Sequence, residues 1–155
     1  MEASQVQFTD EEQAGINRFL AKYGSWIAER GVNASMYDDG ITLLHCAAMS
    51  NDAVYGVLIT KYLVSVGANI HAKSDNGCTP LHFAAIYGGS IKTVQFLVSV
   101  GADVNVQAFC GDTPLDYVKG LNDFGYAKEE TESKNNMKII EYLESIGAKS
   151  GSEAS

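Results

Sequence analysis

A six-residue segment occurs twice in this chain, and its spacing restricts the fold more than any other feature. Residues 63–68 and residues 97–102 both read LVSVGA, 34 positions apart. The segment TPLH at 79–82 has the counterparts TLLH at 42–45 and TPLD at 113–116. Self-similarity with a period of 20–50 residues is typical of chains built from stacked structural units. The sequence therefore predicts a short solenoid.

The central unit, residues 74–105, contains the signals of one turn and two helices. Asn76 and Gly77 accept the positive φ of a tight turn. Thr79 supplies a hydroxyl N-cap, and Pro80 suits the first helical position. A second helix follows after a Gly-Gly break, with an apolar stripe of period i, i+3, i+4 at Val94, Leu97 and Val98.

These segments resemble the ankyrin repeat, whose Thr-Pro-Leu-His motif and period of about 33 residues match the central unit closely. The resemblance implies an all-α solenoid of stacked helix-turn-helix units with short β-turn fingers between them. We expect three repeats, at about 37–70, 74–105 and 108–148. The first departs from the family pattern because Leu43 replaces the usual proline, although Thr42 still offers a cap.

The two ends of the chain lack the full repeat pattern. Residues 1–8 are expected to be a mobile N-terminus. A single domain is expected over residues 9–148. Thr9 and Glu12 form a capping-box pattern, and Gly24 is expected to separate two short helices in an atypical N-terminal capping unit over 9–33. Residues 149–155 are small and polar, so we predict a disordered tail there.

The third repeat is longer than the second. Thr113 to Gly147 covers 34 positions, whereas Thr79 to Gly101 covers 22. The extra residues fall within 120–136, whose glycines, glutamates and asparagines are typical of an exposed acidic loop.

Composition limits the classes of partner. The chain has 155 residues, 46% of them hydrophobic, and a formal charge of −8. Nucleic acids and anionic membranes are bound through basic patches, which this sequence lacks, so we expect neither as a partner. A basic protein partner fits better. No export signal or apolar run of membrane-spanning length is visible, so we predict a cytoplasmic monomer, or a nuclear one in a eukaryotic cell.

The cysteines and histidines do not form a catalytic or metal-binding pattern. Cys46, Cys78 and Cys110 are odd in number and sit at three different positions of the repeat, which indicates reduced thiols. His45 and Cys46 are adjacent on a predicted helix, where side chains point about 100° apart and cannot readily share a proton. We predict no enzyme activity, cofactor or metal.

The ankyrin resemblance also implies roles for particular residues. The histidines at the motif position are expected to tie repeats together, and the threonines before them to cap helices: His45, His82, Thr42, Thr79 and Thr113. The finger turns and the exposed side of each first helix are expected to form a concave partner-binding surface: Met36, Asp38, Asp39, Ile41, Met49, Lys73, Asp75, Asn76, Ile86, Tyr87, Gln107, Phe109 and Asp112. In a eukaryotic source, Asn105 resembles the target of an asparaginyl hydroxylase.

Two functional classes stay open. The leading one is a non-enzymatic protein-binding module, acting as an adaptor or as a stoichiometric inhibitor. Its apolar surface residues would serve as anchors for a protein partner, although isolated surface apolars occur in every soluble protein. The alternative is an enzyme or enzyme subunit with a site in 120–136, where Asp123, Tyr126, Glu129 and Glu130 are the dense ionisable group.

Overall fold

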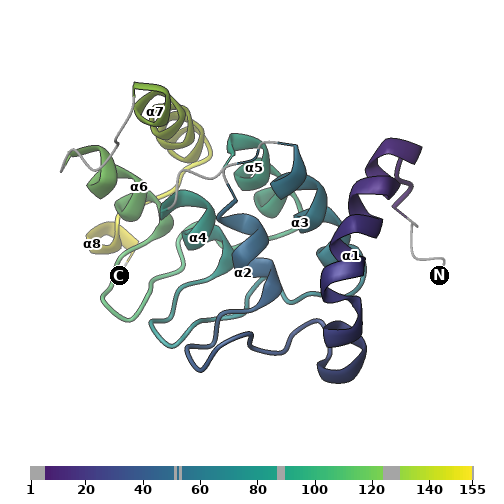
Figure 1. Ribbon diagram of the computed structural model, residues 1–155. Coiled ribbons are helices and arrows are strands. Elements are labelled where there is room, and N and C mark those ends of the chain that lie inside the picture. The colour runs from purple at the N-terminus through teal and green to yellow at the C-terminus, as the bar shows by residue number, and fades with distance from the viewer. Residues whose placement is uncertain (1–5, 51, 53, 87–89, 124–129, 155) are drawn as a thin grey trace, which may run out of the picture.

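The helices of this chain lie in two parallel rows, seen in Figure 1. This computed structural model describes residues 6–50, 52, 54–86, 90–123 and 130–154. Within those ranges the regular structure is helical, with no β-strand and one isolated β-bridge between Ser35 and Thr42. The helices are α1 (Asp10–Arg30), α2 (Leu43–Ala48), α3 (Tyr55–Ser65), α4 (Pro80–Ile86), α5 (Ile91–Ser99), α6 (Pro114–Asp123), α7 (Glu130–Ser145) and α8 (Gly151–Ala154).

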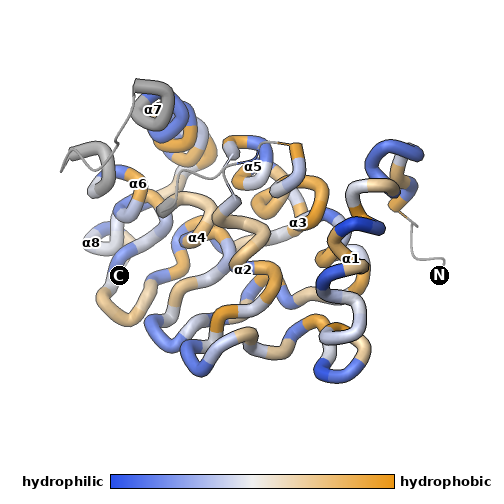
Figure 2. The backbone as a smooth tube through the Cα atoms, viewed as in Figure 1, coloured by the Kyte–Doolittle hydropathy of each residue, from blue (hydrophilic) through white to orange (hydrophobic). Residues whose placement is uncertain are grey.

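Each repeat contributes one helix to each row. The short helices α2, α4 and α6 stack on one another, and α3, α5 and α7 stack behind them. Loops between the units extend as fingers at the bottom of Figure 1, and Figure 2 shows hydrophilic residues at the tips of the first two fingers and hydrophobic residues at the tip of the finger that precedes α6. The predicted solenoid of helix-turn-helix units is therefore confirmed. Among the described residues, no helix is long and apolar enough to cross a membrane.

The repeated apolar positions form the core. Leu63 and Leu97, which occupy the same place in the duplicated segment, are both fully buried. Leu63 belongs to a cluster that joins α1, α2 and α3, while Leu97 belongs to a cluster that joins α4 to α7. Ala84 and Ala85 are fully buried in the second cluster, where their small side chains allow neighbouring helices to pack closely.

The N-terminal unit differs from the expected helix pair. One helix, α1, runs from Asp10 to Arg30 without a break at Gly24, and it packs on α3. Thr9 and Glu12 form the predicted capping box at its start. Before the helix, the ring centroid of Phe8 lies 6.4 Å from that of Tyr62, so Phe8 is near the first repeat. Residues 1–5 lie outside the described part of the chain.

The long third repeat also differs in detail from the predicted loop over 120–136. Helix α6 continues to Asp123, and α7 already begins at Glu130, so much of this segment extends two helices. Residues 124–129 lie outside the described residues. Asn136, expected in an exposed loop, is a buried helical residue.

Histidine side chains connect each helix start to the next finger. The backbone N–H of Thr42 donates to Nδ1 of His45 at 3.1 Å, so Nδ1 is an acceptor and Nε2 carries the proton. Nε2 lies 3.0 Å from the carbonyl oxygen of Cys78, to which it donates. His82 makes the same contacts with the N–H of Thr79 and the carbonyl of Asp112. Both histidines are fully buried.

In the last unit Asp116 stands where the earlier units have a histidine. Its side chain therefore accepts a hydrogen bond from the following segment, whereas the histidine rings donate one. Its Oδ2 accepts from the N–H of Thr113 at 2.9 Å, as the histidine ring does in the earlier units. The same oxygen accepts from the N–H of Gly151 at 2.6 Å. Gln107 Nε2 donates to the carbonyl of Gly151 at 2.8 Å. The C-terminal segment, predicted to be disordered, therefore contains a short helix hydrogen-bonded to the last repeat.

Placing a branched side chain at Gly151 is expected to release the C-terminal segment. A Cβ atom there would lie 1.9 Å from the carbonyl oxygen of Gly111, which is closer than any real contact. We expect Gly151→Val to lower the free energy of unfolding by about 1–3 kcal/mol, because the hydrogen bond to the Asp116 carboxylate is lost. Thermal denaturation and carboxypeptidase digestion measure this. Ser152→Val, at an exposed position, should leave both unchanged; equal behaviour of the two variants would contradict the docking.

Candidate functional site

The three fingers are joined edge to edge by their backbones. The N–H of Asp75 donates to the carbonyl of Asp39 at 2.8 Å, which links the first finger to the second. The N–H of Phe109 donates to the carbonyl of Asn76 at 3.0 Å, which links the second to the third. Gly77 has φ of 77° in the second turn, a conformation that a residue with a side chain rarely adopts. The side chains on the fingers therefore lie on a fixed backbone.

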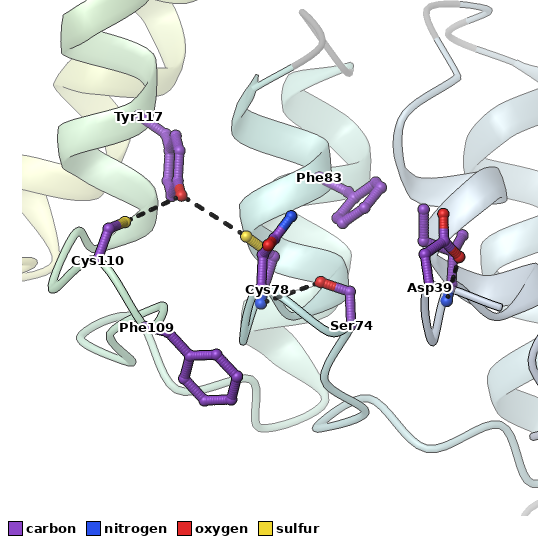
Figure 3. A pocket seen from close by; sticks show the side chains of 9 residues that line it. Asp39, Ser74, Cys78, Phe83, Phe109, Cys110 and Tyr117 are labelled. Atoms are coloured by element: carbon purple, nitrogen blue, oxygen red, sulfur yellow. Dashed lines mark hydrogen bonds between the residues drawn. The ribbon is translucent and has the colours of Figure 1, made fainter.

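A groove of about 430 Å³ opens where the fingers meet the first helices (Figure 3). Three aromatic rings and one carboxylate contribute to its lining, together with small polar and thiol side chains. We call it the finger groove, and it is lined by Asp39, Ile41, Ser74, Asn76, Cys78, Phe83, Phe109, Cys110 and Tyr117.

Two of the rings are held by the buried histidines. The ring centroid of Phe83 lies 4.9 Å from that of His45, and the centroid of Tyr117 lies 5.4 Å from that of His82, both edge-on. Burial lowers the pKa of both histidines, which favours neutral imidazoles at pH 7. The aromatic walls are thus fixed by packing against uncharged rings.

The hydroxyl of Tyr117 lies between two thiols, as Figure 3 shows. Its Oη is 3.7 Å from Sγ of Cys78, which donates to it, and 3.3 Å from Sγ of Cys110. Burial is the main cause that raises the pKa of the Tyr117 phenol, so this hydroxyl is neutral at pH 7. Burial likewise raises the pKa of the Cys78 thiol. The hydrogen bonds position the Tyr117 ring, and burial keeps the Cys78 thiol protonated, so it is not activated as a nucleophile.

The arrangement is suited to binding more than to catalysis. Both ring nitrogens of His45 and His82 have hydrogen-bond partners in the helix start and the next finger. Burial raises the pKa of the Cys46 thiol, which donates to Sδ of Met36 at 3.7 Å. Within the described ranges, no three or more His, Cys, Asp or Glu side chains are placed to hold a metal ion.

The structure brings together part of the surface that the sequence predicts. Asp39, Ile41, Asn76 and Phe109 line the finger groove. Five more predicted residues are exposed, which leaves them accessible to a partner: Asp38, Met49, Lys73, Asp75 and Asp112.

The remaining predicted residues have other surroundings. Met36 is half-buried beside Cys46, and Gln107 is occupied by its hydrogen bond to Gly151. The side chain of Ile86 and the whole of Tyr87 lie outside the described residues.

Phe83 and Tyr117 are groove residues that the sequence analysis missed, and so is Ser74. Phe83 directly follows His82, and Tyr117 directly follows Asp116, so both occupy the position after the motif histidine. The equivalent residue in the first repeat is Cys46. The sequence did contain a signal for these groove residues: the position holds a large aromatic side chain in the second and third repeats but a smaller one in the first.

Asn105, the residue considered for hydroxylation, lies at a junction between repeats. Its Oδ1 accepts from the N–H of Lys149 at 2.8 Å. Asn33 makes the equivalent bond to the N–H of Asn69 at 2.7 Å. These contacts describe a bridging role, and modification of Asn105 stays a prediction.

A second hollow of about 230 Å³ lies where α1 meets α2 and α3. Phe19, Tyr23 and Tyr55 contribute rings to it, and Cys46 lies at its border with the first repeat. Its lining is mostly apolar, with Lys22 and Ser50 as the polar members. This hollow is therefore a second place where an apolar side chain of a partner could insert.

Comparison with protein families gives the class of this chain. The family model described as Ankyrin repeats (3 copies) matches residues 13–108, so the chain belongs to the ankyrin repeat family. The match ends before α6, and the longer last unit lies outside it. No match was found among curated proteins.

Proposed function

We propose that this chain is a non-enzymatic module that binds a basic protein partner through its fingers and first helices, as an adaptor or a stoichiometric inhibitor. Ankyrin repeats generally mediate protein–protein interaction. The observation that supports this particular surface is the finger groove, whose lining combines aromatic side chains with the carboxylate of Asp39. Buried aromatic anchors with a polar rim are characteristic of protein interfaces.

The exposed aspartates on the fingers, which we call the rim aspartates, predict the sign of the partner's charge. Asp38, Asp75 and Asp112 are exposed on the three fingers, and the N–H of Asp75 donates to the carbonyl of Asp39. A Cβ atom at Gly40 would lie 3.0 Å from Oδ1 of Asp75, which places that carboxylate against the first finger. Carboxylates gathered from adjacent fingers produce a negative potential that attracts a basic partner.

Truncation of the exposed ring should weaken the complex. Phe109 is 75% exposed, so Phe109→Ala removes contact area without opening the core. We expect the affinity for a partner, isolated by affinity capture and identified, to fall by about 2 kcal/mol, or roughly 30-fold, mainly through faster dissociation. Surface plasmon resonance measures this. Val100→Ala, at an exposed position just after α5, should leave Kd unchanged.

The rim aspartates should affect a different rate constant. Replacing Asp38 and Asp75 by asparagine should slow association and reduce its dependence on salt, with little effect on dissociation. Undiminished binding by the Phe109 variant, together with loss of binding when residues 120–136 are replaced, would contradict the proposal. That result would favour the alternative site in the segment that contains Asp123, Tyr126, Glu129 and Glu130.

A further inference from the structure

Each finger ends in a tip of the same construction. A backbone hydrogen bond of 2.8–2.9 Å joins the two arms of every finger and encloses its turn. Each turn ends on a glycine with φ between 76° and 93°: Gly40, Gly77 and Gly111. We call this glycine and the two residues before it the tip, which gives 38–40, 75–77 and 109–111. The three tips can therefore be compared position by position.

The side chains at the tips change along the solenoid. The first tip carries two aspartates, the second an aspartate and an asparagine, and the third a phenylalanine and a cysteine. Figure 2 shows the resulting change from hydrophilic to hydrophobic. Lys73 and Asp112 lie outside the tips, on the arms of the second and third fingers. The tips thus offer two carboxylates, then one, then an aromatic ring.

One row of equivalent side chains crosses all three fingers. Asp38, Asp75 and Phe109 each lie four residues before the threonine of the repeat motif, and all three are exposed. A Cβ atom at Gly40 would lie 3.0 Å from Oδ1 of Asp75, and one at Gly77 would lie 2.7 Å from Cδ1 of Phe109. Each of these two side chains therefore leans on the glycine of the preceding tip. Their equivalent surroundings indicate an even spacing along the row.

The spacing of the row follows from the construction of the fingers. A finger has two arms, and adjacent fingers are hydrogen-bonded edge to edge, so the repeat distance is two strand spacings, about 10 Å. Stacked helices also lie about 8–10 Å apart. Figure 3 shows Asp39 and Phe109 at opposite ends of the finger groove, with Cys78 and Ser74 between them. Separate side chains of a partner must therefore contact the first and third fingers.

A polyproline II segment matches this spacing with few residues. It has three residues per turn and rises about 3.1 Å per residue, so side chains at i, i+3 and i+6 lie on one face about 9 Å apart. In a β-strand, side chains at i and i+3 point to opposite faces. An α-helix returns to one face after about 10 Å only every seven residues, so three contacts would need about fifteen residues.

We propose that the three finger tips bind a polyproline II segment of the partner that has basic residues at i and i+3 and an apolar residue at i+6. The basic side chains pair with Asp38 and Asp75, and the apolar side chain packs on the exposed side of Phe109. Arginine suits the basic positions, because its planar guanidinium pairs with a carboxylate through two hydrogen bonds. This inference rests on the proposed function, because it names the segment of a basic partner that the fingers recognise.

Three blocked peptides of identical composition test the order of the side chains. RPPRPPL and its reverse, LPPRPPR, cover both chain directions, whereas RPPLPPR has leucine in the middle. Proline favours polyproline II, and seven residues are too few for a stable α-helix. In NMR titrations of the full chain labelled with ¹⁵N, one of the first two should shift the amides of Asp39, Asn76 and Cys110 with a single Kd. It should bind at least fivefold more tightly than RPPLPPR.

Two outcomes of these titrations would overturn the proposal. Equal binding of all three peptides would show that the tips do not distinguish the order of basic and apolar residues. Shifts confined to other surfaces, or no binding by any of the peptides, would show that the tips do not take such a segment.

Two exposed aspartates provide matched variants for the second tip. Asp75→Asn and Asp103→Asn each remove one negative charge, but Asp103 lies outside the tips. Asp75→Asn should weaken the preferred leucine peptide at least threefold, whereas Asp103→Asn should change its Kd less than twofold. Equal losses would mean that the peptide responds to net charge alone, and the pairing at the second tip would be wrong.

The third tip can be converted from apolar to acidic. In Phe109→Asp, the affinity for RPPRPPR relative to the preferred leucine peptide should rise at least tenfold. Val54→Asp adds the same charge at the N-cap of α3, where the side chain is 76% exposed, close to the 75% of Phe109. This control should change the ratio less than twofold. The same ratio in both variants would show that Phe109 does not select the third residue.

The captured partner separates this inference from the proposed function. If the partner loses affinity for the Phe109→Ala variant, but RPPRPPL and LPPRPPR displace it no better than RPPLPPR does, the fingers bind the partner and the segment is wrong. If the partner binds the Phe109→Ala variant normally, the proposed function itself fails.

Discussion

Replacing Leu97 by alanine is expected to lower the free energy of unfolding by about 2–5 kcal/mol. Leu97 is fully buried in the cluster that joins α4, α5, α6 and α7. The substitution removes apolar contacts and leaves a cavity at the centre of the solenoid, where each unit is stabilised mainly by its neighbours. Small domains have only about 5–15 kcal/mol of stability, so the loss should be a large fraction of the total.

Urea denaturation followed by circular dichroism measures this loss, with Val100→Ala as the control. Val100 lies just after the same helix but is 38% exposed, so its truncation should cost well under the amount lost at Leu97. A melting temperature of Leu97→Ala within one degree of the unsubstituted chain would show that the repeat core is not organised around this position.

The sequence was sufficient to predict the repeated part of the fold. The same local signals recur in each unit: a threonine cap, a small-residue first helix and an apolar stripe on the second. Stacking then follows, because no single unit can bury its apolar face alone. The confirmed all-α ankyrin architecture depends on these repeated signals, and the family match over residues 13–108 agrees with them.

The ends of the chain were harder to predict because tertiary contacts override local preferences there. Gly24 costs a helix about 1 kcal/mol relative to alanine, but burial of Ile16 and Phe19 on one side of α1 opposes that cost. The docking of Gly151 depends on Asp116, 35 residues earlier. No local pattern in residues 149–155 indicates such a partner.

The candidate site was predictable at the fingers and less so on the helices. Turn positions such as Asp39, Asn76 and Phe109 follow directly from the repeat register, and the structure places all three on the groove. Phe83 and Tyr117 lie on helix faces, and only the packing of each ring against a histidine determines which way it points. That information depends on three-dimensional contacts between neighbouring units.

The stability of the fold is expected to decrease as the pH falls below about 6.5, because His45 and His82 must remain neutral in the folded state. Burial lowers the pKa of both imidazoles relative to the value of 6.5 in an unfolded chain. Between the folded and unfolded pKa values, the unfolded chain binds more protons, so lowering the pH favours unfolding. Each histidine can contribute a slope of up to about 1.4 kcal/mol per pH unit in that window.

Urea titrations between pH 7.5 and 5.2 measure this slope in a range where most carboxylates keep their charge. His82→Asn is the informative variant, because asparagine can still accept from the N–H of Thr79 but cannot reach the carbonyl of Asp112. Asp116 already performs the capping role without an imidazole in the last repeat. We expect this variant to be less stable at pH 7.5 but to lose stability less steeply on acidification. If the two chains have the same slope, proton uptake by His82 does not contribute, and the acid sensitivity must arise from other groups.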